Sequence, residues 1–214
     1  MGLTVKESGG NFVPCPAGTH LGICISIYDL GTQTTPFKDE KTGETKRSKQ
    51  VFIQWETPSE LMPDGTPFVI GKFYTASLNE KANLRHDLEA WRARVFSAEE
   101  LEGFSLTSIL GKPCMLSVVQ YQRADGTTGA KIGNVMAMPK GTKAPPPQNK
   151  IVSFDIDEWN DAVYRGLDEY WQKQIAQSDE ARSRNLGAAM ARTGGNGVGS
   201  GAQHEPPADD DIPF

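Results

Sequence analysis

Hydrophobic and polar residues alternate along five stretches of this chain, which is the pattern of half-buried β-strands. The alternation is found over residues 21–28, 50–55, 68–75, 115–122 and 130–138. Two turn sequences separate neighbouring stretches: Pro63-Asp64-Gly65 precedes the third, and Ala124-Asp125-Gly126 lies between the fourth and the fifth. Because Pro, Asp and Gly favour tight turns and Asp-Gly favours hairpins, the pattern predicts five strands that end in a β-hairpin.

Helical spacing replaces the alternation between the third and fourth stretches. One apolar helix face is predicted from Leu84, Leu88, Trp91 and Val95. The sequence Ser77-Leu78-Asn79-Glu80 precedes this face and has the pattern of a capping box, in which Ser and Glu bond each other's backbone amides. A second capping box, Ser97-Ala98-Glu99-Glu100, predicts a shorter helical segment that ends near Gly103.

The resulting element order is three strands, a helix and two strands. This is the order of an OB fold, a five-stranded Greek-key barrel with a helix between strands three and four. Such barrels bind oligonucleotides across the face of strands two and three and with two loops. One loop joins strands one and two and the other joins strands four and five, which here are residues 31–48 and 123–130. A small mixed α+β sheet would give a similar periodicity, and that alternative stays open. The expected fold class is mainly β.

The chain after residue 142 has a different character. Pro145-Pro146-Pro147 marks a boundary, and residues 151–156 predict an extra strand. An amphipathic helix is expected over 158–177, with its apolar face packed on the barrel, because such a stripe is rarely stable alone. Its apolar positions are Trp159, Val163, Leu167, Tyr170 and Trp171. The expected organisation is therefore a barrel over 1–142, an extension over 143–177 and a disordered Gly-rich tether with an acidic end over 178–214.

Composition limits the classes of function. The net charge of −5 divides unevenly, with 17 Lys and Arg against 15 Asp and Glu in residues 1–150, and 5 against 12 in residues 151–214. A nearly neutral body with an acidic C-terminal third is compatible with a modest phosphate-binding groove. Three widely spaced cysteines without a C-x-x-C pair indicate reduced, partly buried thiols and neither a disulfide framework nor a zinc site.

Several other classes find no support in the sequence. No H-E-x-x-H, Walker A or G-x-S-x-G motif is present, so we expect no enzymatic activity, no small-molecule substrate, no cofactor and no metal. No apolar run is long enough to span a bilayer, and the N-terminus lacks the pattern of a signal peptide. The expected location is the cytoplasm, without a membrane partner.

The chain ends in three carboxylates, a stiff Ile-Pro pair and an aromatic ring. These residues are Asp209, Asp210, Asp211, Ile212, Pro213 and Phe214. Six such residues cannot build a core, but the ring suits a small apolar pocket on a partner, and the carboxylates suit a basic rim. The hexapeptide resembles the C-terminal tip of bacterial single-stranded DNA-binding proteins, the SSB family. An acidic tail that only increases solubility is the alternative.

The resemblance implies a protein that binds and protects single-stranded DNA with little sequence preference, and whose tip recruits replication, recombination or repair enzymes. The stretch from Phe68 to Tyr74 and onward to Arg92 is similar to phage or prophage SSB-like proteins, which puts the bacterial tetramer in doubt. A phage protein of this kind would act in the cytoplasm of its bacterial host. Two other functions stay open: an adaptor that captures host replication factors without touching DNA, and a strand-annealing recombination protein.

The alternation also predicts which side chains meet a nucleic acid. The core of the first three strands is expected to contain Ile23, Ile25, Ile53, Trp55, Val69 and Phe73. Aromatic rings on the opposite face can stack on bases without reading sequence, and the candidates are Phe52, Tyr74, Tyr28 and Tyr121. The candidates for phosphate contacts are Lys38, Lys41, Lys46, Arg47, Lys49, Lys72, Arg123 and Lys131. Alternatively, Phe52 and Tyr74 lie beneath the long loop or the C-terminal helix, and the charges of residues 38–49 pair with one another.

Overall fold

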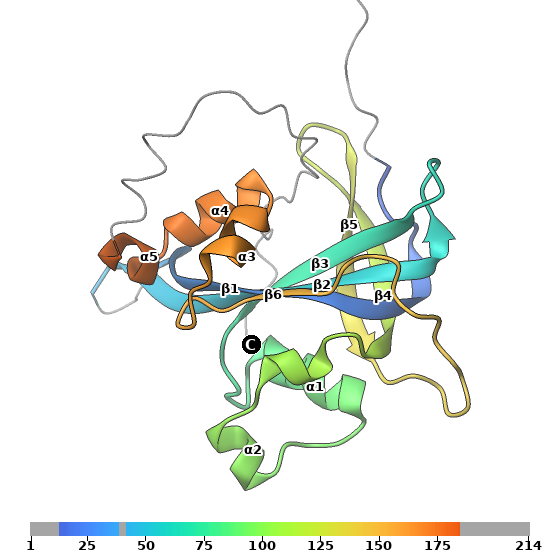
Figure 1. Ribbon diagram of the computed structural model, residues 1–214, viewed down its shortest axis with the longest axis horizontal. Coiled ribbons are helices and arrows are strands. Elements are labelled where there is room, and N and C mark those ends of the chain that lie inside the picture. Colours follow the sequence, from blue (N-terminus) through green and yellow to red (C-terminus); the bar gives the residue numbers. More distant parts are fainter. Residues whose placement is uncertain (1–12, 39–41, 185–214) are drawn as a thin grey trace, which may run out of the picture.

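The computed structural model describes residues 13–38 and 42–184, and its centre is a six-stranded sheet (Figure 1). The strands are β1 (Gly18–Lys38), β2 (Thr45–Leu61), β3 (Pro67–Thr75), β4 (Pro113–Gln122), β5 (Thr128–Met136) and β6 (Val152–Phe154). Five of them follow the antiparallel order β3-β2-β1-β4-β5, and the short β6 pairs in parallel with β1. The predicted predominance of β-structure is confirmed, and each predicted alternating stretch corresponds to a strand.

Strand β1 is central and is covered on both faces. Its early residues pair with β4 and its later residues with β6, while β2 follows its other edge for most of its length. Ile27 belongs to one hydrophobic core and the next residue, Tyr28, to another. Strand β2 divides in the same way, because Ile53 lies in the first core and Phe52 in the second. The sheet therefore separates two cores, which we call the first core and the second core.

The first core is closed by α1 (Asn83–Arg92), which buries Leu84, Leu88 and Trp91. The helix begins later than predicted: the Ser77 hydroxyl accepts from the amide of Asn79 in a local turn, and Ala82 is the N-cap without a side-chain bond. It also ends earlier, at Arg92, and the next residue, Ala93, has a left-handed φ of 53°. Val95 lies beyond this end and is 71 % exposed, so its predicted place on the apolar face is wrong.

Between α1 and β4 the chain forms α2 (Ala98–Glu102) and the single 3₁₀ turn η1 (Leu106–Ile109). The predicted capping box is present at α2. The Ser97 hydroxyl accepts from the Glu100 amide, and the Glu100 carboxylate accepts from the Ser97 amide. The β4–β5 hairpin also forms at the predicted turn, where Gly126 has a φ of 82° and the Asp125 carboxylate accepts from the Thr127 amide.

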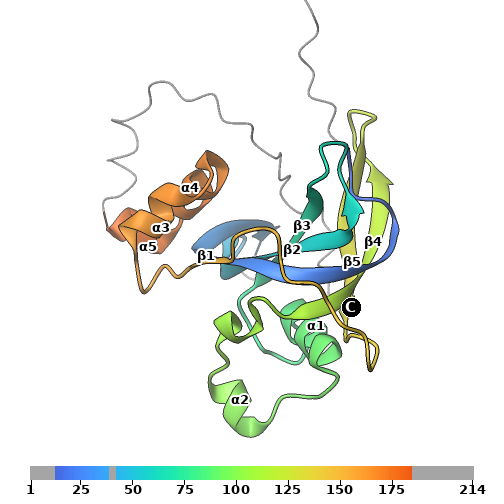
Figure 2. The same cartoon turned by 45° about the vertical axis from the view of Figure 1, so that its right-hand side comes forward.

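The second core is closed by a C-terminal extension, defined here as residues 152–184. After β6 it forms α3 (Asp161–Gly166), α4 (Glu169–Ala176) and α5 (Asp179–Ser183) in place of the single predicted helix. The break within the predicted range lies between α3 and α4, where Leu167 and Asp168 have extended backbone. Side-chain caps are present at Asn160, where α3 begins, and at Ser178, where α5 begins. Figures 1 and 2 show these helices on one side of the sheet and α1 and α2 on another. None of the helices in the described ranges is long and apolar enough to cross a bilayer.

Candidate nucleic-acid interface

Three of the four aromatic residues predicted to stack on bases are buried. Phe52 is 1 % exposed, and its ring centroid lies 4.2 Å from that of Trp171 on α4. Tyr28 lies in the same core, with its ring 5.3 Å from Trp171. The expected exposure of these rings is wrong because the extension covers this face of β1 and β2. For Phe52, burial beneath the C-terminal helix is the alternative that the sequence left open. Neither ring offers a face to a base in this structure.

Tyr74 is buried for a different reason: β3 has the opposite phase from the one predicted. Phe68 and Ile70 lie in the first core together with Tyr74, whereas the predicted core residue Val69 is only partly buried and Phe73 packs against the second core. The Tyr74 hydroxyl donates to Asp87 Oδ2 at 2.7 Å.

Lys72 shares the acceptor that Tyr74 uses. Its Nζ lies 2.9 Å from Asp87 Oδ2, and the side chain is only 21 % exposed. A lysine that is paired and largely covered is poorly placed to hold a phosphate. The predicted phosphate contact of Lys72 is therefore replaced by an ion pair between β3 and α1.

Tyr121 is the one predicted stacking residue that stays partly exposed, and it lies on the β4–β5 hairpin. It pairs across the strands with Gly129, and a Cβ on Gly129 would lie 2.7 Å from the ring, so only glycine permits this close approach. Lys131 Nζ lies 5.9 Å from the centre of the same ring. Arg123 stands at the turn of this hairpin, with its guanidinium near the Thr127 hydroxyl. The hairpin thus combines one aromatic ring with two predicted phosphate-binding side chains.

The outer part of the β1–β2 hairpin carries most of the exposed positive charge that was predicted to contact phosphates. Lys38, Lys46 and Arg47 are exposed there, and Lys41 lies outside the described residues. Phe37 is 41 % exposed beside Lys38 and was not among the predicted stacking residues. Its signal in the sequence is an aromatic residue next to a lysine in a long polar stretch, which no periodic pattern reveals. This hairpin therefore offers a ring and cations on one projecting element.

Two cations of this hairpin, Lys49 and Arg47, form ion pairs with carboxylates. Lys49 Nζ lies 3.0 Å from Asp29 Oδ2 and 2.8 Å from Asp157 Oδ2. Partial burial lowers the pKa of Lys49, but the hydrogen bonds to Asp157 and Asp29 outweigh it and raise the pKa above its ordinary value. Arg47 pairs with Asp179 on α5. The acidic partners Asp157 and Asp179 both belong to the extension.

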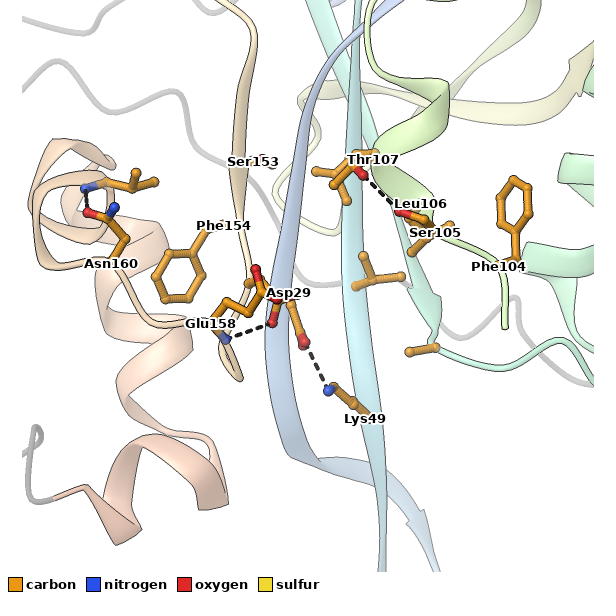
Figure 3. Close-up of a pocket in the computed structure, with 15 residues that line it drawn as sticks. Asp29, Lys49, Phe104, Ser105, Leu106, Thr107, Ser153, Phe154, Glu158 and Asn160 are labelled. Carbon is orange, nitrogen blue, oxygen red and sulfur yellow. Dashed lines mark hydrogen bonds and ion pairs between the residues drawn. The ribbon is translucent and has the colours of Figure 1, made fainter. Parts of the chain in front are cut away.

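A groove of about 580 Å³ crosses β1 and β2 between the extension and residues 104–107 (Figure 3). Its apolar lining includes Ile27 and Val51, and its charged residues are mainly acidic, with Asp29, Asp155 and Glu158 against Lys49. Such a lining repels phosphate, so the groove is not the nucleic-acid site. Asp29, Asp155 and Asp157 are close enough to hold a cation, and Lys49 already supplies one.

The three cysteines are all buried and free. Burial raises the pKa of Cys15 to about 11 and that of Cys24 to about 12, so neither forms a reactive thiolate near neutral pH. These thiols act as small apolar groups in the core. The tether was predicted to begin at residue 178, but its first residues form α5, with Ser178 and Ala181 buried, so that start is wrong. The rest of the predicted tether and the tip at residues 209–214 lie outside the described residues.

No family model and no curated protein matches this chain in comparisons with known proteins. The function must therefore be argued from the chain's own residues and their arrangement.

Proposed function

We propose that this protein binds and protects single-stranded DNA without sequence preference in the cytoplasm, and recruits replication, recombination or repair enzymes through its C-terminal tip. The observation that carries the proposal is the sequence of residues 209–214, three Asp followed by Ile-Pro-Phe, which matches the tip of the SSB family. A short segment with an aromatic anchor, a stiff proline and an acidic flank is suited to capture by a basic pocket on a partner.

The sheet supports the proposal. An OB fold has the strand order β3-β2-β1-β4-β5, closed by contact of β3 with β5, and a helix between β3 and β4. The order found here agrees, α1 occupies that position, and Lys72 Nζ of β3 lies 3.4 Å from the Gly133 carbonyl of β5. We propose that β3 and β5 close the sheet into an OB-type barrel.

The proposed path of the DNA strand differs from the usual one across strands two and three. Trp171 and its neighbours cover Phe52 there, so bases cannot reach that face without displacing α4. The exposed ring and cations of the β1–β2 hairpin offer an open alternative, with Phe37 for stacking and Lys38 and Lys46 for phosphates. Phosphate contacts of this kind release counterions, so binding weakens as salt rises.

The test is fluorescence anisotropy of a labelled oligo-dT with the full-length chain at two salt concentrations, repeated with duplex DNA. We expect tight, salt-sensitive binding to the single strand and weak binding to the duplex. Phe37→Ala should weaken binding about 5- to 100-fold, because stacking contributes roughly 1–3 kcal/mol per base. Leu61→Ala removes an exposed apolar side chain from the β2–β3 hairpin and is the matched control. Equal affinities of the two variants would remove Phe37 from the interface, and no binding by the wild type would refute the proposal.

The adaptor is the second candidate, and the covered face of β1 and β2 is the observation that favours it. If the extension permanently occupies the surface that OB folds use for nucleic acid, the domain can instead serve as a carrier for the tip. An adaptor should show no salt-dependent binding to DNA in the same experiment. It should still bind a replication enzyme, and that binding should be lost when residues 209–214 are removed.

A further inference from the structure

We propose that the C-terminal extension competes with DNA phosphates for Arg47 of the β1–β2 hairpin. The inference rests on the proposed function, because it names a regulator of the same binding surface. The extension carries eight Asp and Glu against four Lys and Arg, and two of these carboxylates already contact hairpin cations. A carboxylate and a phosphate offer the same kind of acceptor to a guanidinium or an ammonium group.

Arg47 is the cation most open to exchange. Its partner Asp179 is 42 % exposed and Arg47 itself is 44 % exposed, so water reaches both side chains. Exposed ion pairs are weak, and a phosphate can replace the carboxylate without leaving the arginine unpaired. Arg47 is thus a predicted phosphate contact, and in the protein without DNA it is paired with Asp179.

Lys49 is held more firmly than Arg47. Two carboxylates, Asp29 and Asp157, lie within 3.0 Å of its Nζ. A phosphate would have to approach a site that already carries two negative charges, which is unfavourable. Lys49 is therefore expected to stay with its partners, and the exchange is confined to Arg47.

The anchor of α5 is separate from the competing residue. Both carboxylate oxygens of Glu180 accept from Thr32, one from the amide and one from the hydroxyl, each at 2.8 Å. These two bonds attach α5 to β1 whether or not Asp179 is paired. DNA can therefore displace Asp179 from Arg47 while the helix stays in place.

Removing the charge of Asp179 should strengthen DNA binding. In Asp179→Asn, Arg47 no longer faces a carboxylate, and oligo-dT should bind about two- to fivefold more tightly at low salt. The slope of log K against log salt should also become steeper by about 0.7, the value for one additional phosphate contact on a single strand.

The experiment measures anisotropy of labelled oligo-dT across a salt series with five full-length proteins. They are the wild type, Asp179→Asn, Asp161→Asn, Arg47→Ala, and a double variant of Arg47→Ala with Asp179→Asn that is compared with Arg47→Ala alone. Asp161→Asn changes the net charge equally, at an exposed aspartate of α3 that faces Arg165 and accepts a hydrogen bond from the Trp159 indole, which an asparagine oxygen can also accept. We expect no effect of Asp161→Asn, and no effect of Asp179→Asn once Arg47 is absent.

Two results would overturn the competition. Equal gains from Asp179→Asn and Asp161→Asn would mean that only net charge matters, and a gain that persists without Arg47 would mean that Arg47 is not the contested cation. Unchanged affinity in Asp179→Asn, with normal salt-dependent binding by the wild type, refutes the competition but leaves the proposed function standing. Absence of binding by every protein refutes both, so the two failures are distinguishable.

Discussion

At the scale of single residues, Glu56 has the most demanding environment in the described part of the chain. It is fully buried on β2, and its carboxylate accepts from the amides of Gln148 and Asn149 and from the Asn149 side chain, each at 2.8 Å. A buried carboxylate requires such donors, and here they fix the segment that leads into the extension. Glu56→Gln places an NH₂ group against one of these donors. We expect a loss of about 1–3 kcal/mol in the free energy of unfolding, measured by urea denaturation.

Glu44→Gln is the control for this substitution, because Glu44 is an exposed glutamate near the tip of the β1–β2 hairpin. Its effect should stay within about 0.5 kcal/mol, as for most surface substitutions. A similar small effect of Glu56→Gln would show that the three donors find water or other acceptors when the charge is removed.

The sequence predicted the exposure of single side chains wrongly where both faces of a strand are covered. Alternation identifies a strand, but it assigns exposure only if one face meets water. Phe52 and Tyr28 lie beneath α4, which belongs to a distant part of the chain, and no local pattern reveals that contact. The buried state of Ile23, Ile25, Ile53 and Trp55 was predicted and is confirmed.

At the scale of elements, local chemistry predicted best where the relevant bonds are local. The strands, the β4–β5 turn and the capping box of α2 depend on residues within a few positions of one another, and all are found. The helix expected over 158–177 is instead divided into α3 and α4, because Leu167 and Asp168 have extended backbone. The spacing of apolar residues alone does not reveal where the helix is interrupted.

Because the Glu100 carboxylate forms the capping box of α2, the stability of this region should depend on pH. Hydrogen bonds from Arg94, then from the Ser97 amide, lower the pKa of Glu100 from 4.5 to about 2. A carboxylate whose pKa is depressed by folding contributes stability above its unfolded pKa, and this contribution is lost as the pH falls through the folded value. The stability difference between the wild type and Glu100→Gln should therefore be full above about pH 5 and shrink between pH 4.5 and 2.

Thermal denaturation of both proteins across pH 2 to 6 measures this difference. Glu99→Gln is the control, since Glu99 lies in the same first turn but does not form the capping box. A difference between wild type and Glu100→Gln that stays constant over the whole range would show that the ionised form of Glu100 is not what stabilises α2.

At the scale of the whole molecule, one sheet serves two cores, and the extension is a structural part of the domain. Trp171 and Ile175 are almost completely buried against Tyr28, Leu30 and Phe52. The sequence predicted a mainly β body and an acidic C-terminal third, because composition is a property of the whole chain. It left open whether the C-terminal helix covers Phe52 on the face expected to bind DNA, because that depends on long-range packing.

Two truncated chains test this role of the extension. A chain that ends at residue 184 keeps every contact described above, and it should unfold at the same urea concentration as the full chain. A chain that ends at residue 150 exposes Tyr28, Leu30 and Phe52 and should unfold at a much lower concentration or fail to accumulate, because burial of each large apolar side chain contributes about 1.5–3 kcal/mol. Trp171→Ala in the full chain disturbs the second core less than the truncation does. It should lower the free energy of unfolding by about 3–5 kcal/mol.

The outcome bears directly on the path of the DNA strand. If the chain ending at residue 150 were as stable as the full chain, the second core would contribute little, and the extension could leave the sheet at small cost. Phe52 and Tyr28 would then become available to bases, and oligo-dT should bind this shorter chain more tightly and independently of Phe37. If instead the shorter chain is destabilised, the extension cannot leave the sheet without unfolding it. DNA binding by the full chain must then use the exposed hairpins, and Phe37→Ala becomes the decisive substitution.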